Sequence, residues 1–181
     1  MNTAITRVQL AAVLVVTIVG VASADELVAG WDRARWGMSS SDIQKAYPEA
    51  KPDKRRTYNL GGRMYYSDLA LPGIRVGGYD FTVRFLMAKS DALTAVQLGK
   101  DFDKDMSSGK IAYDTVKELL IQKYGRPTTE EHSDSTENLR LFKSVWHSSN
   151  AQITFKYVSI PPTQACFINL TYAKPGDTDK L

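Results

Sequence analysis

The feature that most constrains the fold of this chain is an alternation of apolar and polar residues that recurs along much of its length. In the run Asp80–Ala88, for example, Phe81, Val83 and Phe85 occupy alternate positions. Successive side chains of a strand point to opposite faces of a sheet, so this pattern predicts strands with one apolar face. Six runs are interpreted as strands: Arg63–Leu71, Asp80–Ala88, Leu93–Leu98, Leu139–His147, Ala151–Ser159 and Ala165–Tyr172.

Two segments show a helical period instead. Ser39 is a suitable N-cap for a short helix that ends before Pro48, because proline cannot continue a helix. A longer helix contains Tyr113 and Leu120 on one side and ends at Gly125. The order helix, three strands, helix, three strands predicts an α+β fold. We expect two helix-plus-three-strand units forming one antiparallel sheet with the helices on one face.

The first 24 residues have the three parts of a secretory signal peptide: Arg7, the apolar run Val8–Val21, and small residues up to Ala24. The mature chain, 25–181, is expected to be a single domain with possible tandem halves at 31–105 and 107–174. We therefore expect a periplasmic or secreted protein. Because Asp25, and not a cysteine, directly follows the cleavage site, a lipoprotein is not expected. No later segment is long and apolar enough to span a membrane.

The start of the first helix resembles a known family. The run Trp36-Gly37-Met38-Ser39-Ser40-Ser41-Asp42-Ile43, closed by Tyr47-Pro48, is similar to the helix opening of the beta-lactamase-inhibitor-protein-like superfamily, which includes small lipoproteins of the outer-membrane assembly machinery. This resemblance implies tandem helix-plus-sheet units whose open sheet face binds a protein partner.

Few residues are candidates for chemistry. The chain has two histidines, and Cys166 is its one cysteine, without the spacing of a zinc site. Neither a nucleophile elbow nor a phosphate-binding glycine motif occurs in the sequence. The formal net charge of +3 is too small to indicate nucleic-acid binding. We therefore expect neither an enzyme nor a protein with a cofactor or a bound metal.

A surplus of aromatic residues suggests a binding surface instead. If the sheet face away from the helices is open, aromatic and polar side chains there would form a patch typical of protein interfaces. The residues predicted for this binding face are Tyr65, Arg84, Phe142, Trp146, Lys156, Phe167 and Asn169. A second, basic patch in an expected polar loop would attract an anionic partner. It consists of Lys51, Lys54, Arg55 and Arg56.

Three functions remain open from the sequence. The preferred hypothesis is an exported, non-enzymatic protein that binds an envelope or secreted protein through its open sheet face. The first alternative is a periplasmic carrier of a small apolar or lipid ligand, in a cavity between helices and sheet lined by Phe81, Phe85, Phe155 and Tyr157. The second is a hydrolase with a site that the sequence does not reveal.

Overall fold

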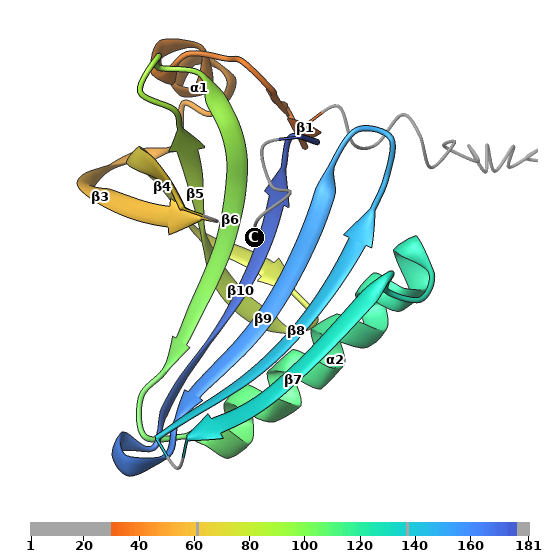
Figure 1. Ribbon diagram of the computed structural model, residues 1–181. Coiled ribbons are helices and arrows are strands. Elements are labelled where there is room, and N and C mark those ends of the chain that lie inside the picture. Colours follow the sequence, from red (N-terminus) through yellow and green to blue (C-terminus); the bar gives the residue numbers. More distant parts are fainter. Residues whose placement is uncertain (1–29, 61, 137, 177–181) are drawn as a thin grey trace, which may run out of the picture.

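The computed structural model describes residues 30–60, 62–136 and 138–176, and of residues 54–56, 60, 63 and 134–136 it describes the backbone alone. The predicted signal peptide, 1–24, lies outside the described residues. One strongly bent antiparallel sheet of eight strands dominates the structure (Figure 1). Within the described residues, neither helix is long and apolar enough to cross a membrane.

The strands follow one another in the sheet almost as they do in the sequence. Their order across the sheet is β3 (Lys51–Leu60), β4 (Arg63–Val76), β5 (Tyr79–Met87), β6 (Leu93–Phe102), β10 (Ala165–Ala173), β9 (Gln152–Ile160), β8 (Leu139–His147) and β7 (Thr129–Thr136). The pair β1 (Gly30–Trp31) and β2 (Ala34–Arg35) forms a separate small ribbon. The other elements are α1 (Ser40–Ala46), α2 (Met106–Tyr124) and the 3₁₀ turn η1 (Pro161–Thr163).

The expected α+β fold of two helix-plus-three-strand units is wrong. The protein is mostly β, because each half of the sheet has four strands and α1 has only seven residues. Each of the six predicted runs matches a strand to within one residue at its start, but the outermost strands at the two edges, β3 and β7, were not predicted, and the basic patch in β3 was expected to lie in a polar loop. An edge strand pairs on one side only and tolerates polar side chains on both faces, so its sequence lacks the alternation that identifies inner strands.

Capping residues set the starts of both helices. The Ser39 side chain accepts a hydrogen bond from the backbone N–H of Asp42, and the Asp42 carboxylate accepts one from the backbone N–H of Ser39. Asp105 caps α2 in a similar way, accepting from the N–H of Ser108 at 2.9 Å. The second helix ends at Gly125, as its sequence predicts.

Both helices pack against the same apolar cluster. On α2, Tyr113 stacks on Phe155 of β9 with ring centroids 4.7 Å apart, and on α1, Ile43 is fully buried. Tyr47, which follows α1, packs against Phe85 of β5. Burial of this one face of the sheet supplies most of the apolar core.

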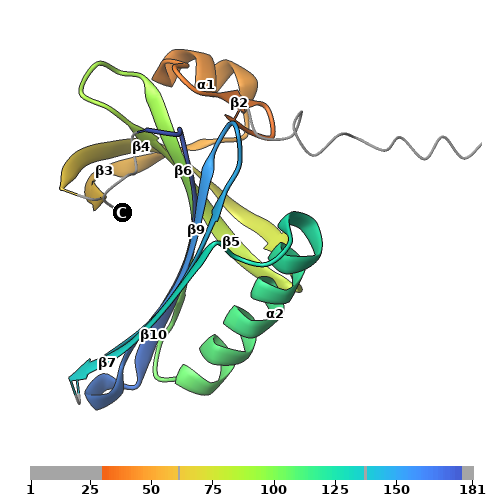
Figure 2. The same ribbon diagram turned by 45° about the vertical axis from the view of Figure 1, so that its right-hand side comes forward.

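The β3–β4 hairpin closes over part of the opposite face. A second, smaller apolar cluster joins Tyr65 of β4 to Leu86 and Ala95 of the inner strands. Beside it, Arg84 Nε of β5 donates to Asp53 Oδ2 of β3 at 3.0 Å. Figure 2 shows α2 and the hairpin on opposite sides of the central strands. The sheet is therefore concave on the side that lacks helices.

Candidate functional site

The strand register places three rows of side chains across the helix-free face of the sheet. Two rows are polar: Thr154, Thr171, Gln97 and Arg84 form one, and Lys156, Asn169 and Gly99 form the other. The third row is apolar and consists of Leu141, Val158 and Phe167. Because neighbouring strands lie about 4.8 Å apart, these rows form one continuous polar-to-apolar surface.

A cleft of about 410 Å³ opens over these rows, between the central strands and the end of β3. Its size falls within the range of small-molecule sites, which span about 300–1,000 Å³. The cleft is lined by Tyr58, Asn59, Gln97, Leu139, Leu141, Thr154, Lys156, Val158, Phe167, Asn169 and Thr171.

The floor of the cleft holds polar groups that the described residues leave unsatisfied. Thr154 is only 3% exposed, and its buried hydroxyl has no hydrogen-bond partner among the described residues. Within the same part of the chain, no hydrogen bond or ion pair reaches the side chains of Lys156 and Asn169. A buried hydroxyl without a partner carries a free-energy cost, so a ligand that supplies an acceptor to Thr154 would stabilise this arrangement.

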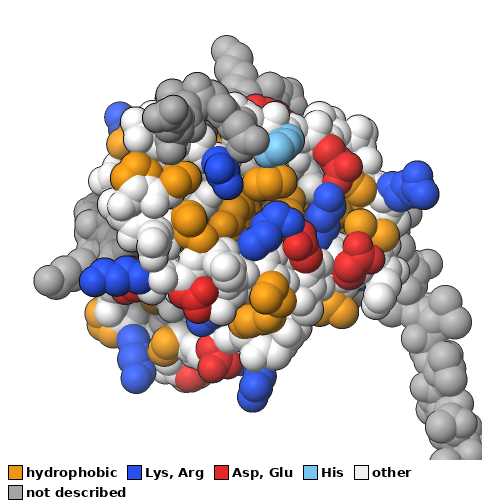
Figure 3. Space-filling view, turned by 90° about the horizontal axis from the view of Figure 1, so that it is seen from below, with side chains coloured by type: hydrophobic (Ala, Val, Ile, Leu, Met, Phe, Trp, Pro, Cys, Tyr) orange, Lys and Arg blue, Asp and Glu red, His pale blue; other side chains and the backbone are white. Residues whose placement is uncertain are grey.

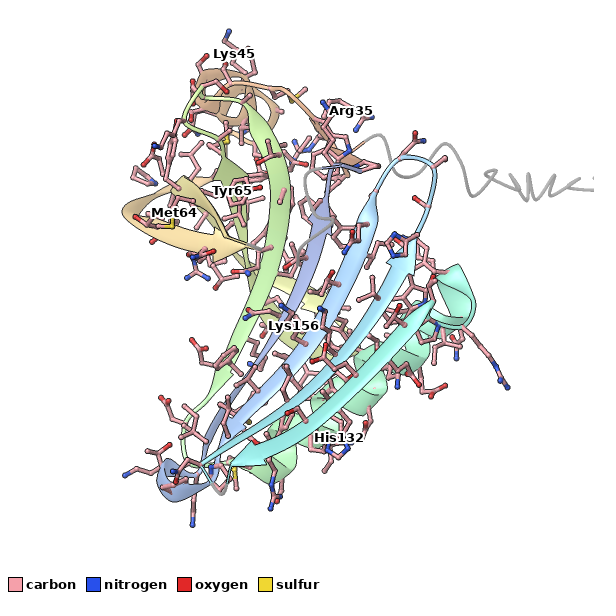
Figure 4. All side chains as sticks on the ribbon, in the orientation of Figure 1. Arg35, Lys45, Met64, Tyr65, His132 and Lys156 are labelled. Atoms are coloured by element: carbon pink, nitrogen blue, oxygen red, sulfur yellow. The ribbon has the colours of Figure 1, made fainter. Side chains whose placement is uncertain are left out.

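Lys156 is the one charged residue among the described lining residues. Burial lowers the pKa of its amine below the ordinary value, and the nearby positive charge of Lys143 lowers it further. Lys143 itself lies 3.8 Å from a carboxylate oxygen of Glu131. Figure 4 shows Lys156 near the middle of the sheet, whereas His132 lies at the β7 edge.

The predicted binding residues divide between the two faces of the sheet. Arg84, Lys156, Phe167 and Asn169 lie on the helix-free face, at or beside the cleft. Tyr65 is buried in the small cluster under the hairpin.

Trp146 and Phe142 were assigned to the wrong face. Both lie on the helix side: Trp146 is 3% exposed and its indole donates to the carbonyl of Gly125 at the end of α2, at 2.8 Å. Phe142 packs between Tyr113 and Tyr157. Both contribute to the core. Trp146 pairs with Ile153 of β9, whose side chain faces the helices, so Trp146 faces the helices as well, and so does Phe142 on the same face of β8.

The predicted basic patch lies on β3, at an edge of the sheet, instead of in a loop. Lys51 is exposed there. The side chains of Lys54, Arg55 and Arg56 lie outside the described residues, so an anionic partner for this patch stays a prediction.

The cavity expected between helices and sheet is filled by side chains. Phe81, Phe85, Phe155 and Tyr157 are each at most 4% exposed and belong to the packed core. The expected carrier cavity is therefore absent at this place within the described residues. The cleft on the other face was missed because it depends on Thr154, Leu141 and Val158, which the alternation alone does not distinguish from ordinary surface positions.

A second hollow, of about 350 Å³, lies on the helix side where α2 begins. His132 stacks there on Phe142, with ring centroids 4.2 Å apart, near Lys110 and Arg140. Seen from this end, hydrophobic side chains gather among basic and acidic ones beside a histidine (Figure 3). Lys110 is already paired with Asp114 at 2.7 Å, and Phe142 fills part of the space between strand and helix.

Metal and thiol chemistry would require particular groups among the side chains that the structure describes. Among them, no group of three or more His, Cys, Asp or Glu residues lies close enough to hold a metal ion. Cys166 is buried against α2, and this burial raises the pKa of its thiol, which disfavours the reactive thiolate.

Comparisons of the chain with protein-family models, with curated proteins and with solved structures returned no match.

Proposed function

We propose that this protein is an exported binding protein that holds its ligand in the cleft on the helix-free face of the sheet. The observation that carries the proposal is the buried Thr154 hydroxyl without a partner among the described residues, which lies beside the half-buried Lys156 and Asn169 on the floor of an apolar-walled cleft. Core polar groups in proteins are normally paired, and an exception of this kind is expected where a ligand completes the pairing.

The lining of the cleft favours binding over catalysis. Its described residues include no carboxylate, imidazole or thiol, and Lys156 is their one amine. General acid–base catalysis needs a proton donor and acceptor at the reacting atoms, and nucleophilic catalysis needs an activated nucleophile with a base beside it. A lone amine with a threonine and an amide can instead orient a polar group.

The cleft also favours a small ligand over a broad protein interface. The aromatic anchors expected for a protein partner, Trp146 and Phe142, face the core. The residues that do face the cleft surround a concave space, whereas protein partners usually bury a wider surface of about 800 Å² on each side. A small ligand therefore accounts for the arrangement better than the envelope or secreted protein that the sequence suggested.

Filling the cleft tests this proposal. Leu141→Trp places an indole in the cleft, and Leu119→Trp places the same group on the outer surface of α2, where Leu119 is 41% exposed. Native mass spectrometry of the protein purified from its producing cells should show a bound small molecule in the wild type and in Leu119→Trp, but not in Leu141→Trp. Ligand retention by both variants alike would place binding elsewhere. A wild type that carries no small molecule and binds none from a broad metabolite panel would refute the function.

A further inference from the structure

We infer that the cleft selects an unbranched aliphatic carboxylate, whose carboxylate group lies at Lys156 and whose chain covers the apolar row of Leu141, Val158 and Phe167. This inference rests on the proposed binding function and names the class of ligand for the same site. It follows from three properties of the cleft: its donors, its charge and the position of its apolar wall.

The free polar groups of the cleft are suited to an acceptor. Lys156 and Asn169 are directly paired neighbours on β9 and β10, and Thr154 lies two residues before Lys156 on the same face of β9. Paired neighbours have Cβ atoms about 5 Å apart, and residues two apart on a strand are separated by about 7 Å. The amine can donate three hydrogen bonds, the amide two and the hydroxyl one. A carboxylate, which only accepts, can satisfy donors from all three.

The charge of the cleft corresponds to one negative group. Two other basic residues lie on this face, and both have carboxylate partners: Arg84 of β5 pairs with Asp53 at 3.0 Å, and Lys143, the neighbour of Lys156 on β8, lies 3.8 Å from Glu131. Lys156 forms no ion pair among the described residues, and the negative charge of Glu131 offsets only part of the lowering of its pKa by burial and by Lys143. A monoanion would therefore neutralise the site, while a cationic headgroup would be repelled by a partly buried amine.

The apolar wall begins one row away from the amine. Val158 follows Lys156 by two residues on β9 and pairs with Phe167, and Leu141 pairs with Val158 from β8. Leu139, 41% exposed, continues the surface to the rim of the cleft. A chain anchored at Lys156 would lie over Val158 and contact Leu141 and Phe167 on its two sides, and burial of its methylene groups against these side chains would drive binding.

The volume of the cleft guides the choice of a probe. The cleft of about 410 Å³ corresponds to roughly 14 water molecules at about 30 Å³ each. Roughly a dozen non-hydrogen atoms of a ligand would fill it. Decanoate is therefore a suitable probe, and acetate, which lacks the chain, is its short control.

The experiment is isothermal titration calorimetry of the purified exported protein with three probes that share a ten-carbon chain: decanoate, decan-1-ol and decyltrimethylammonium. The wild type should bind decanoate at least tenfold more tightly than decan-1-ol, and the cationic probe most weakly. Acetate should show no binding. Because charge-assisted hydrogen bonds are screened less when partly buried, the preference for decanoate should persist at 0.5 M salt.

Three variants locate the headgroup. Lys156→Met keeps a long unbranched side chain and should weaken decanoate binding tenfold or more, with little effect on decan-1-ol. Lys143→Met, which removes the paired neighbouring lysine, should change decanoate affinity less than threefold. Thr154→Val keeps the shape of the side chain and should weaken decanoate binding by a smaller factor, which provides a second test if Lys156→Met does not fold.

The outcomes separate the two proposals. Equal binding of the three ten-carbon probes, or undiminished decanoate binding by Lys156→Met, would refute the carboxylate inference and leave the binding function standing. Failure of the wild type to bind any of the probes would also refute the inference. The proposed binding function is refuted only if, in addition, the wild type carries no small molecule in native mass spectrometry and binds none from the metabolite panel.

Discussion

The substitution Gly109→Ala in α2 should destabilise this protein, although the same change in an exposed helix normally stabilises. At this position α2 lies against β10 and β6: an added Cβ would be 2.1 Å from Cys166 Sγ and 3.3 Å from the ring of Phe102. Replacing glycine by alanine within a helix gains about 0.5–1 kcal/mol. Inserting a carbon into a packed core costs about 1–3 kcal/mol, and a contact of 2.1 Å belongs at the upper end of that range.

We therefore expect a net loss of about 2 kcal/mol in the free energy of unfolding for Gly109→Ala. For a domain of this size, this corresponds to a decrease in Tm of about 4–8 °C. Urea unfolding followed by circular dichroism gives the free energies directly, since a small single domain commonly unfolds in one cooperative step.

A double-mutant cycle with Cys166→Ala isolates the contact. Cys166→Ala removes the Sγ atom that the new methyl group would meet, so Gly109→Ala should cost clearly less in that background than in the wild type. An equal cost in the two backgrounds would show that the sulfur does not set the helix-to-sheet distance. A Gly109→Ala protein more stable than the wild type would refute the close approach altogether.

Three further substitutions test the fold. Trp146→Ala should lower the free energy of unfolding by about 3–5 kcal/mol in urea titrations, because the side chain is buried and its indole donates to a carbonyl at the end of α2; a loss below 1 kcal/mol would instead place it on the surface. Hydrogen bonds from Ser108 lower the pKa of Asp105, so this N-cap carboxylate stabilises the fold above its unfolded pKa of about 4, and the stabilisation disappears as pH falls through the lower folded value. The stability difference between the wild type and Asp105→Ala, measured by thermal unfolding between pH 7 and pH 2, should shrink in acid, and a difference that grows in acid would contradict this assignment. Arg84→Met leaves the partly buried Asp53 carboxylate unpaired and should cost about 1–3 kcal/mol, more than the double variant Arg84→Met/Asp53→Leu; the opposite order would mean that the ion pair does not fasten β3 over the sheet.

Cleavage of the N-terminal run as a signal peptide is a separate prediction. Mass spectrometry of the protein recovered from the cell envelope or medium should show Asp25 as the first residue. A chain that keeps its N-terminal apolar run would contradict the predicted export.

The sequence by itself determined the local elements whose causes are local. Three local features were predicted: the cap of α1 at Ser39, the end of α2 at Gly125 and the strand in Leu139–His147. Helix capping, helix termination and the alternation of a strand all depend on residues within a few positions of one another. The edge strands β3 and β7 carried no such signal, since their pairing requires only a neighbouring strand.

The tertiary structure decided which face of each strand is covered. In β8 both faces carry large apolar residues, Leu141 and Val145 on one and Phe142 and Trp146 on the other, so alternation shows two faces without showing which one α2 will cover. The pairing of β8 with β9 settles this and turns Trp146 toward the core.

The cleft depends on contacts between distant parts of the chain. The bend of the sheet brings Tyr58 of β3 beside Thr154 of β9 and Phe167 of β10. The sequence placed Lys156 and Asn169 on one face, because side-chain direction in a strand alternates from one residue to the next. That these groups share a concave, partly buried space with an unsatisfied hydroxyl results from long-range packing, which no local pattern of residues specifies.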